Sequence, residues 1–257
     1  MKKRVSVFAA AAAVVIAAVC IMPANAEAKK KTVYVIRSIT VKNTSDRTLD
    51  TISYSYNKKG MVVKRIWKQP GGSSTNKYSY DKDLNLVKDT GYEGRKKGSV
   101  VSYKYEDGKL VSASANYIAM KVKENLTYEY DKNGRLKCYD GDNTPEMTLK
   151  YDKKGLLTKV SALYNYPGAK PEVTKYKYDS KGNVIKHYEF GGLFRIYKNK
   201  YSGKRLDSVT ACYKSGKKIC TDHIKYKKLK VDKKYVPAIK AQQVPAFRDP
   251  VFSMFPF

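Results

Sequence analysis

A ten-residue phrase recurs along the chain and constrains the fold more than any other feature. It is YEYDKNGRLK at 128–137, with altered copies YSYNKKGMVV (54–63), YSYDKDLNLV (78–87), LKYDKKGLLT (149–158) and YKYDSKGNVI (176–185). The second tyrosine of each copy marks the repeat, and the successive markers, spaced by 21 to 27 residues, are Tyr56, Tyr80, Tyr105, Tyr130, Tyr151, Tyr178 and Tyr201. A period of this length indicates one supersecondary unit repeated along the chain.

The residue pattern of this ten-residue phrase predicts a β-hairpin. Tyr-x-Tyr places two rings on one face of a strand, because strand side chains alternate between faces. An Asp or Asn then opens a tight turn, and a Gly three residues later accepts positive φ. The predicted turn-forming residues are Asn57 with Gly60, Asp81, Asp131 with Gly134, Asp152 with Gly155, and Asp179 with Gly182.

Two copies depart from this spelling. In YKYEDGKL (103–110), Asp107 and Gly108 stand alone between two strands, which favours a two-residue primed turn. In the copy at 78–87, Leu84 occupies the usual Gly position. Because a branched side chain resists positive φ, we expect Asn85 or a longer loop to absorb the strain there.

The residues between the turns predict an all-β fold. Alternation resumes after each Gly, and the segments 68–76, 139–146 and 165–172 are rich in Pro, Gly and Asx, as loops are. We therefore expect an antiparallel meander of repeated hairpins. With about fourteen strands or more it should form an elongated, curved or spiralling sheet.

These residues resemble the tyrosine-aspartate (YD) repeats of the RHS and teneurin families. The resemblance covers most of 54–219 and rests on the Tyr, the Asp, the Gly and the aliphatic residue that follows, as in YEYDKNGRL and YKYDSKGNV. It implies a hairpin sheet, which in the larger relatives coils into a hollow shell. Seven or eight hairpins are too few for a large shell, no clear copy of the self-cleaving core of those shells is present, and no catalytic residue is implied.

The N-terminus predicts export. Basic residues at 2–4, an apolar run from Val5 to about Met22 and an Ala-Asn-Ala site indicate a signal peptide at 1–26, cleaved after Ala26. A retained membrane anchor is the alternative, and a lipoprotein at Cys20 is disfavoured by the bulky Val19 before it. A basic linker (27–32), the repeat domain (33–235) and a tail rich in Pro and Phe (236–257) follow, and the protein is expected to be secreted or bound at the cell surface.

The charge balance suggests a polyanionic partner. The formal net charge is +29, and loss of residues 1–26 with their three basic residues leaves +26. Such a chain favours anionic wall or surface polymers or acidic glycans. The alternative is that the lysines only keep an exposed sheet soluble. Nucleic acid is not expected, since the chain is exported and contains no known binding module.

The tyrosine rows have two interpretations. Packed across neighbouring strands they would form the sheet core, which we favour. Left exposed, they would be flat platforms for sugars. The residues concerned are Tyr54, Tyr56, Tyr78, Tyr80, Tyr103, Tyr105, Tyr128, Tyr130, Tyr151, Tyr176 and Tyr178.

Little in the sequence suggests catalysis or a cofactor. His187 and His223 lie in strand-like stretches without a nucleophile motif, and the glutamates are scattered. No phosphate-binding glycine loop or C-x-x-C metal spacing occurs, so no catalytic residue, cofactor or metal is expected.

Two cysteines suggest a disulfide. Cys212 and Cys220 are symmetric about Gly216, so a hairpin turning there would set them opposite one another, and export permits the bond. The alternative is two reduced thiols. Cys138 would stay unpaired.

The tail at 236–257 contains four prolines and four phenylalanines, so it is not a regular central strand. It would cover the sheet or bind a partner, and we favour the cover.

Taken together, these features predict a secreted, non-enzymatic binding or scaffolding protein of the cell envelope. The alternatives are a carbohydrate-binding module using exposed tyrosines and an enzyme with an unrecognised site.

Overall fold

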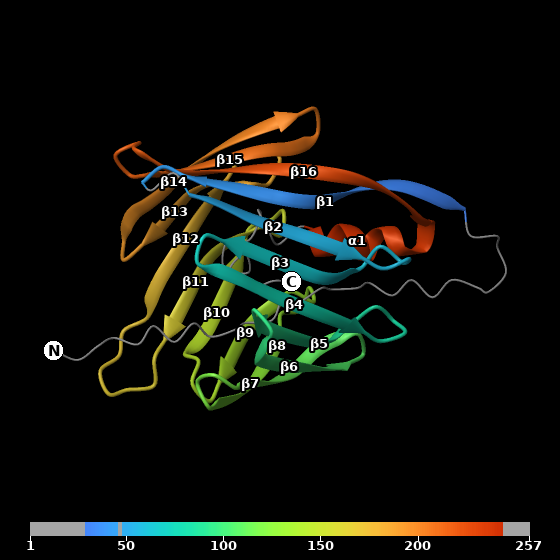
Figure 1. Ribbon diagram of the computed structural model, residues 1–257. Helices are drawn as coiled ribbons and strands as arrows, with labels where there is room; N and C mark the ends of the chain where they lie inside the picture. Colours follow the sequence, from blue (N-terminus) through green and yellow to red (C-terminus); the bar gives the residue numbers. More distant parts are fainter. Residues whose placement is uncertain (1–28, 46–47, 244–257) are drawn as a thin grey trace.

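The computed structural model describes residues 29–45 and 48–243, and these form an antiparallel β-barrel (Figure 1). The predicted signal peptide, Cys20 and residues 244–257 lie outside the described residues. In chain order the strands are β1 (Lys30–Asn43), β2 (Leu49–Tyr56), β3 (Val62–Gln69), β4 (Gly72–Tyr80), β5 (Leu86–Glu93), β6 (Lys96–Glu106), β7 (Lys109–Tyr117), β8 (Val122–Tyr130), β9 (Leu136–Gly141), β10 (Glu146–Tyr151), β11 (Leu157–Leu163), β12 (Glu172–Tyr178), β13 (Val184–Glu189), β14 (Gly192–Ser202), β15 (Arg205–Tyr213) and β16 (Lys218–Asp232).

The all-β antiparallel meander is confirmed, but the spiralling sheet is wrong. Every strand pairs with its neighbours in the chain, and β1 also pairs with β16, so the sheet closes on itself. This closing pair is long, running from Lys30 opposite Asp232 to Asn43 opposite Cys220. Closure leaves no open sheet edge among the described strands. It also takes in residues 30–32, which the sequence had assigned to a linker.

A β-bulge at the same place in every hairpin that carries the repeated sequence helps to explain the curvature. Tyr130 lies opposite Leu136 and Glu129 opposite Cys138, so Lys137 is an extra residue. The same extra residue follows the aliphatic residue that faces the second tyrosine of each other copy. Bulges bend a strand and increase its twist, which curved sheets require.

The chain ends supply an eighth copy of this unit. Tyr226 on β16 lies opposite Ile36 on β1, and Arg37 is the extra residue. The two strands come from opposite ends of the described chain, so no tight turn joins them. The repeat therefore runs round the whole barrel, and its last unit is assembled from both termini.

The predicted turn residues adopt the expected geometry. In the turn at 131–135, Asp131 Oδ1 accepts hydrogen bonds from the amides of Asn133 (2.8 Å) and Arg135 (3.0 Å), and Gly134 has φ of 71°. The turns that begin at Asn57, Asp81, Asp152 and Asp179 repeat these bonds. Asp107 and Gly108 both have positive φ, at 49° and 71°.

The expectation for Leu84 is wrong. Neither Asn85 nor a longer loop takes up the strain, because Leu84 itself adopts φ of 69°. Its side chain packs against an apolar cluster that includes Met61 and Ile239. This packing offsets the cost of a left-handed conformation, which is about 1–2 kcal/mol for a residue with a Cβ.

The second tyrosine of the phrase links neighbouring hairpins. The Tyr130 hydroxyl donates to the carbonyl oxygen of Leu110, 3.0 Å away, in the preceding hairpin. Tyr80 donates in the same way to Val62 (2.7 Å), and Tyr226 to Leu206 (2.8 Å). Tyr56 and Tyr178 make the corresponding bonds to Ile36 and Leu157. The repeat thus encodes a contact between units as well as the turn within each unit.

Replacing Tyr130 with Phe is therefore expected to destabilise the barrel. The variant keeps the ring but leaves the Leu110 carbonyl without this donor, so the free energy of unfolding should fall by about 0.5–1.5 kcal/mol. Urea unfolding followed by circular dichroism measures the difference. Tyr166→Phe is the control, because Tyr166 is 61% exposed and should change stability little. Equal losses in the two variants would contradict the proposed link between hairpins.

The inner face of the barrel is apolar. Leu110, Leu126, Leu149 and Val160 are all at most 4% exposed, and they belong to a cluster that runs from β6 to β13. Three further clusters continue round the barrel. The alternate side chains therefore point outward.

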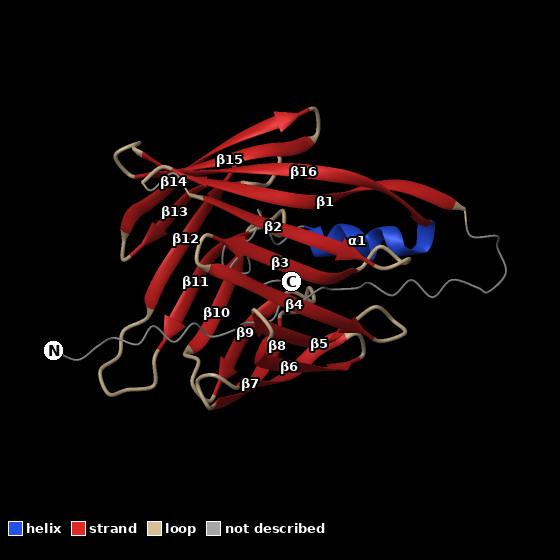
Figure 2. Cartoon of the chain, viewed as in Figure 1, coloured by secondary structure: helices blue, strands red, loops and turns tan. Residues whose placement is uncertain are grey.

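One end of the barrel carries the single α-helix of the described chain (Figure 2). A short 3₁₀ turn, η1 (Lys233–Tyr235), follows β16 and leads into α1 (Val236–Gln243). Ile239 is 2% exposed, and Gln242 accepts from the Val62 amide (3.2 Å) and donates to the Tyr80 hydroxyl (2.9 Å). The start of the tail thus folds as a helix on the barrel, which the sequence analysis did not predict. No helix in the described ranges is long and apolar enough to cross a membrane.

Candidate functional site

The tyrosine face does not form an exposed binding platform. Tyr78, Tyr128 and Tyr176 are 6–7% exposed, and the other eight tyrosines of the set are partly buried on the same inner face. Burial raises the pKa of Tyr78 well above its ordinary value. The interpretation of these tyrosines as an exposed platform is therefore wrong, and the surface available to a ligand is the outer wall.

The outer wall of β10–β13 carries a concentration of lysines. Lys150 lies opposite Lys159, Lys159 lies opposite Lys175, and Lys177 lies opposite Lys186. Val160 and Tyr176, their neighbours along β11 and β12, are buried on the inner face, so these lysines point outward. We call Lys150, Lys159, Lys175, Lys177 and Lys186 the lysine row.

No carboxylate of the described residues neutralises the lysine row. Among the described residues, none of its five side chains has a carboxylate within 4 Å; the lysine ion pairs, such as Lys137 with Glu129 (3.6 Å), lie elsewhere. Like charges directly opposite one another destabilise a sheet. A set of like charges without a neighbouring carboxylate can attract an external anion.

A groove lies along the row. It has a volume of about 490 Å³, and its lining includes Lys159, Lys175 and Lys177 together with Tyr188 and Gly191. The ammonium group of Lys177 is 5.9 Å from the centre of the Tyr188 ring. The groove therefore combines several donors of positive charge with an aromatic side chain, which suits an anionic chain containing sugar or polyol units.

The predicted disulfide is not formed. Cys212 and Cys220 are both free thiols. A bulge shifts the register so that Cys220 pairs with Ala211 and Cys212 with Lys218. The symmetric spacing about Gly216 therefore does not set them opposite one another. Burial raises the pKa of Cys220 to about 11, which disfavours a reactive thiolate.

The two histidines lie on opposite faces of the sheet. His187 stacks on Tyr176 inside the barrel, with ring centres 5.1 Å apart, and its Nε2 is 3.1 Å from Glu189 Oε1. Burial lowers its pKa to about 4, so the ring is neutral at physiological pH. His223 is exposed on β16. The two rings do not converge on one site.

Two of the glutamates considered as candidate catalytic residues contact other side chains of the barrel. Glu124 is 1% exposed and accepts a hydrogen bond from the Thr144 hydroxyl. Glu129 lies on the outer wall beside Lys137. No group of three His, Cys, Asp or Glu side chains in the described part of the chain is placed to hold a metal ion.

The lysine row was not predicted from the sequence, although some of its lysines occupy fixed positions in the repeat. Lys177 stands between the two tyrosines of YKYD, and Lys150 precedes Tyr151 in LKYD. Since the tyrosines face inward, these positions must face outward. Which lysines become neighbours depends on strand register, which the sequence alone did not supply.

Comparisons with known proteins address the fold. The sequence matches no protein-family profile and no curated protein. A solved structure of a porin-like protein from Bacteroides uniformis aligns with 75% of this chain and 96% of its own, at 12% identity and a TM-score of 0.53. The chain shares that protein's barrel fold.

Two other solved structures are less similar. A porin-like protein from Bacteroides vulgatus aligns with 75% of this chain and 98% of its own, at 10% identity and a TM-score of 0.35. A structure described as TcdB2-TccC3-TEV aligns with 67% of this chain and 10% of its own, at 16% identity and a TM-score of 0.30.

The outer wall differs from that of a membrane-spanning barrel. Such barrels present a band of apolar residues to lipid. Here the outward positions of β12 include Lys175 and Lys177, and those of β7 are Ser112, Ser114 and Asn116. A wall of lysine, serine and asparagine suits water and polar polymers.

Proposed function

We propose that this chain is an exported, non-enzymatic binding module of the cell envelope whose outer wall holds an anionic wall or surface polymer. The lysine row carries the proposal, because its five lysines have no ion-pair partner among the described residues and three of them, Lys159, Lys175 and Lys177, line a groove. The formal net charge of +29 supports it by attracting polyanions over a longer range. A repeated wall also suits a repeating ligand, since the same spacing recurs from strand to strand.

We also propose that the hairpins are YD repeats. The support is the shared chemistry of the units: an Asx residue that accepts two turn amides, a Gly with positive φ and a tyrosine bonded to the preceding hairpin. The relationship to that family concerns the sheet. The ligand is inferred separately, from the outer lysines.

The variant Lys159→Gln/Lys175→Gln/Lys177→Gln is expected to bind purified anionic wall material at least tenfold more weakly than the parent protein. Each charged hydrogen bond contributes about 1.5–3 kcal/mol, and a tenfold change corresponds to about 1.4 kcal/mol. Binding of the parent should itself weaken as salt rises from about 0.05 M to about 0.5 M, since salt screens exposed charges. Sedimentation with the wall material measures both effects.

The matched control is Lys88→Gln/Lys123→Gln/Lys198→Gln. These lysines are exposed on strands outside β10–β13, and each lies opposite a neutral residue, namely Ser102, Asn116 and Thr210. The net charge changes equally, so binding should fall much less. Equal losses in the two variants would show attraction by total charge and would refute the site. Wall material stripped of its anionic polymer should retain neither variant nor the parent.

A further inference from the structure

The two rims of the barrel differ in chemistry. One rim, the turn rim, carries the tight Asx-Gly turns, the start of β1 and α1. The other, the loop rim, carries the β1–β2 connection and every second connection after it, ending with β15–β16. In Figure 1, α1 lies at the right-hand end, whereas the β11–β12 loop projects at the left-hand end.

Exposed large apolar side chains gather on the loop rim. Among the described residues eleven such side chains are exposed, and ten of them lie in the loops of this rim or within three residues of them. The ten are Leu49, Trp67, Ile118, Met120, Leu163, Tyr164, Tyr166, Phe190, Phe194 and Tyr213. Single exposed apolar residues are ordinary on protein surfaces, but a set confined to one end of the molecule marks an interaction surface.

The tips of this rim are very exposed. Phe190 is 79% exposed, Tyr166 61% and Met120 52%, and they stand on three different loops. Phe190 also has φ of 49°, a left-handed conformation that a bulky aromatic residue seldom adopts. An apolar side chain that is exposed in this way contributes little to the stability of the barrel.

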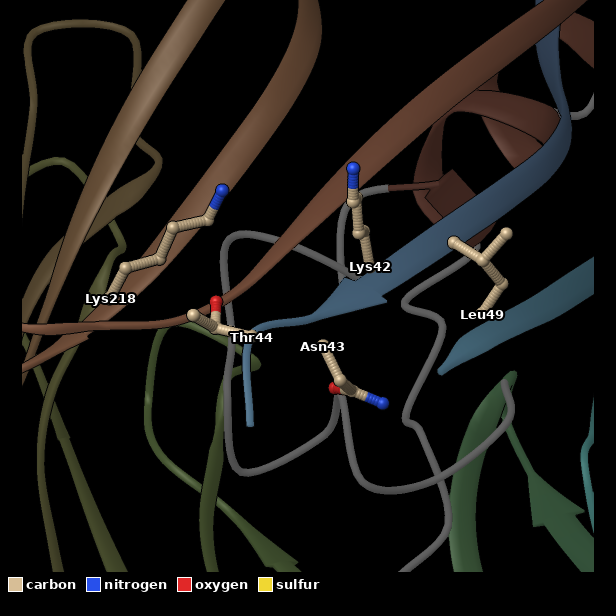
Figure 3. Close-up of a pocket in the computed structure, with 5 residues that line it drawn as sticks. All are labelled: Lys42, Asn43, Thr44, Leu49 and Lys218. Carbon is tan, nitrogen blue, oxygen red and sulfur yellow. The ribbon is translucent and has the colours of Figure 1, made fainter. Parts of the chain in front are cut away.

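Positive charge accompanies these side chains. Between the β1–β2 and β15–β16 connections lies a pocket of about 610 Å³ lined by Lys42, Asn43, Thr44, Leu49 and Lys218. Figure 3 shows the Lys42 and Lys218 side chains extending to the same side of the pocket, with Leu49 nearby. Two ammonium groups and a hydroxyl are groups that bind a phosphate, whereas the Asn43 amide donates to the Thr48 hydroxyl, 2.9 Å away.

We propose that the loop rim docks on an anionic phospholipid surface. Peripheral proteins bind such surfaces by burying aromatic and aliphatic side chains at the boundary between headgroups and acyl chains while nearby lysines meet the headgroups. The rim offers both at the same end, with tyrosines and a tryptophan, which prefer this interface. The docking side chains are not those of the lysine row, although the groove reaches the loop rim at Gly191, next to Phe190. A barrel standing on its loop rim would therefore leave the five lysines of the outer wall free for polymer.

Vesicle binding tests the proposal. The parent protein should sediment with vesicles of phosphatidylglycerol and phosphatidylcholine, and much less with phosphatidylcholine alone. The variant Met120→Ser/Tyr166→Ser/Phe190→Ser should bind the anionic vesicles at least tenfold more weakly. The control is Tyr34→Ser, because Tyr34 is 43% exposed but lies near the start of β1, toward the turn rim. It should bind as the parent does.

The outcomes separate this proposal from the preceding one. The variant Lys159→Gln/Lys175→Gln/Lys177→Gln should keep its vesicle binding while losing its binding of wall polymer. No sedimentation of the parent with anionic vesicles, or equal sedimentation of the parent and the loop-rim variant, would overturn the membrane proposal and point to a protein partner for this rim. Either result would leave the test of the lysine row unaffected.

Discussion

Replacing Gly60 with Ala is expected to lower the free energy of unfolding by about 2–5 kcal/mol, the largest effect we predict for a single methyl group in this chain. Gly60 has φ of 84°, a conformation that costs a residue with a Cβ about 1–2 kcal/mol. The added carbon would also lie 2.5 Å from Ile239 Cδ1 and 3.2 Å from Val231 Cγ1. Relieving that overlap requires the buried Ile239 side chain or α1 to move, and overpacking of this kind costs about 1–3 kcal/mol more.

Gly134→Ala provides the matched control. Gly134 occupies the same place in its turn with φ of 71°, but a Cβ there would meet no atom within 4 Å. Only the conformational cost should appear, about 1–2 kcal/mol. Denaturant unfolding measures both variants. Shortening the contacting side chain in Gly60→Ala/Ile239→Ala should show a favourable coupling between the two positions. Equal losses at Gly60 and Gly134 would mean that α1 does not seat on the 57–60 turn.

The contrast between Gly60 and Gly134 shows what the sequence could and could not predict. Both glycines follow an Asx residue at the same spacing, so local chemistry identified both turns. Nothing in the phrase distinguishes the one that supports a helix. That contact joins residues about 180 positions apart, as the Gln242 bond to Val62 does, and the sequence of the tail suggested only a cover.

Barrel closure could not be predicted from the repeat either, because it also depends on a contact between distant residues. The eighth unit contains Tyr226 and Ile36 at the expected places but has no Asx-Gly turn, because its strands come from the two ends of the described chain. A search for the phrase therefore finds seven units and an open sheet. The bulge that bends each unit has no residue signature of its own in this chain, since the extra position is Val63 in one copy and Lys137 in another.

A further bulge, in the β15–β16 pair, explains the failure of the disulfide prediction. Counting outward from Gly216 assumes one residue opposite one residue, whereas the register shifts between Ala211 and Cys212. For the candidate site, the alternation of side chains along each strand was sufficient to predict that the tyrosines and the lysines between them lie on opposite faces of the sheet. The lysine row depends instead on the register of β10–β13, and the loop rim depends on which connections lie at the same end of the barrel.

Closure also places a partly exposed carboxylate among apolar side chains. Asp222 lies on β16 opposite Val209 and Val41, with the Cys220 thiol 3.9 Å from its Oδ1. Burial raises the pKa of Asp222 from 3.8 to about 6, and the contact with Cys220 lowers it only in part. The folded protein thus binds this proton more tightly than the unfolded chain does. Its contribution to stability is present below about pH 4 and is lost as pH rises towards 6.

Asp222→Asn is therefore expected to raise the free energy of unfolding at pH 7 by about 2–3 kcal/mol, since two pKa units correspond to about 2.7 kcal/mol. The gain should shrink towards zero at pH 4, where the parent side chain is already protonated. Urea unfolding between pH 4 and pH 7 measures this window.

Asp131→Asn is the control, because its effect on the free energy of unfolding at pH 7 should have the opposite sign. The Arg135 amide and guanidinium lower the pKa of Asp131, so the charged form stabilises the fold. That variant should lose stability at pH 7 and approach the parent as pH falls through the range where Asp131 is protonated. If Asp222→Asn also lost stability at pH 7, the carboxylate would have to be held by a favourable contact in the barrel, and burial could not be the dominant influence on its pKa.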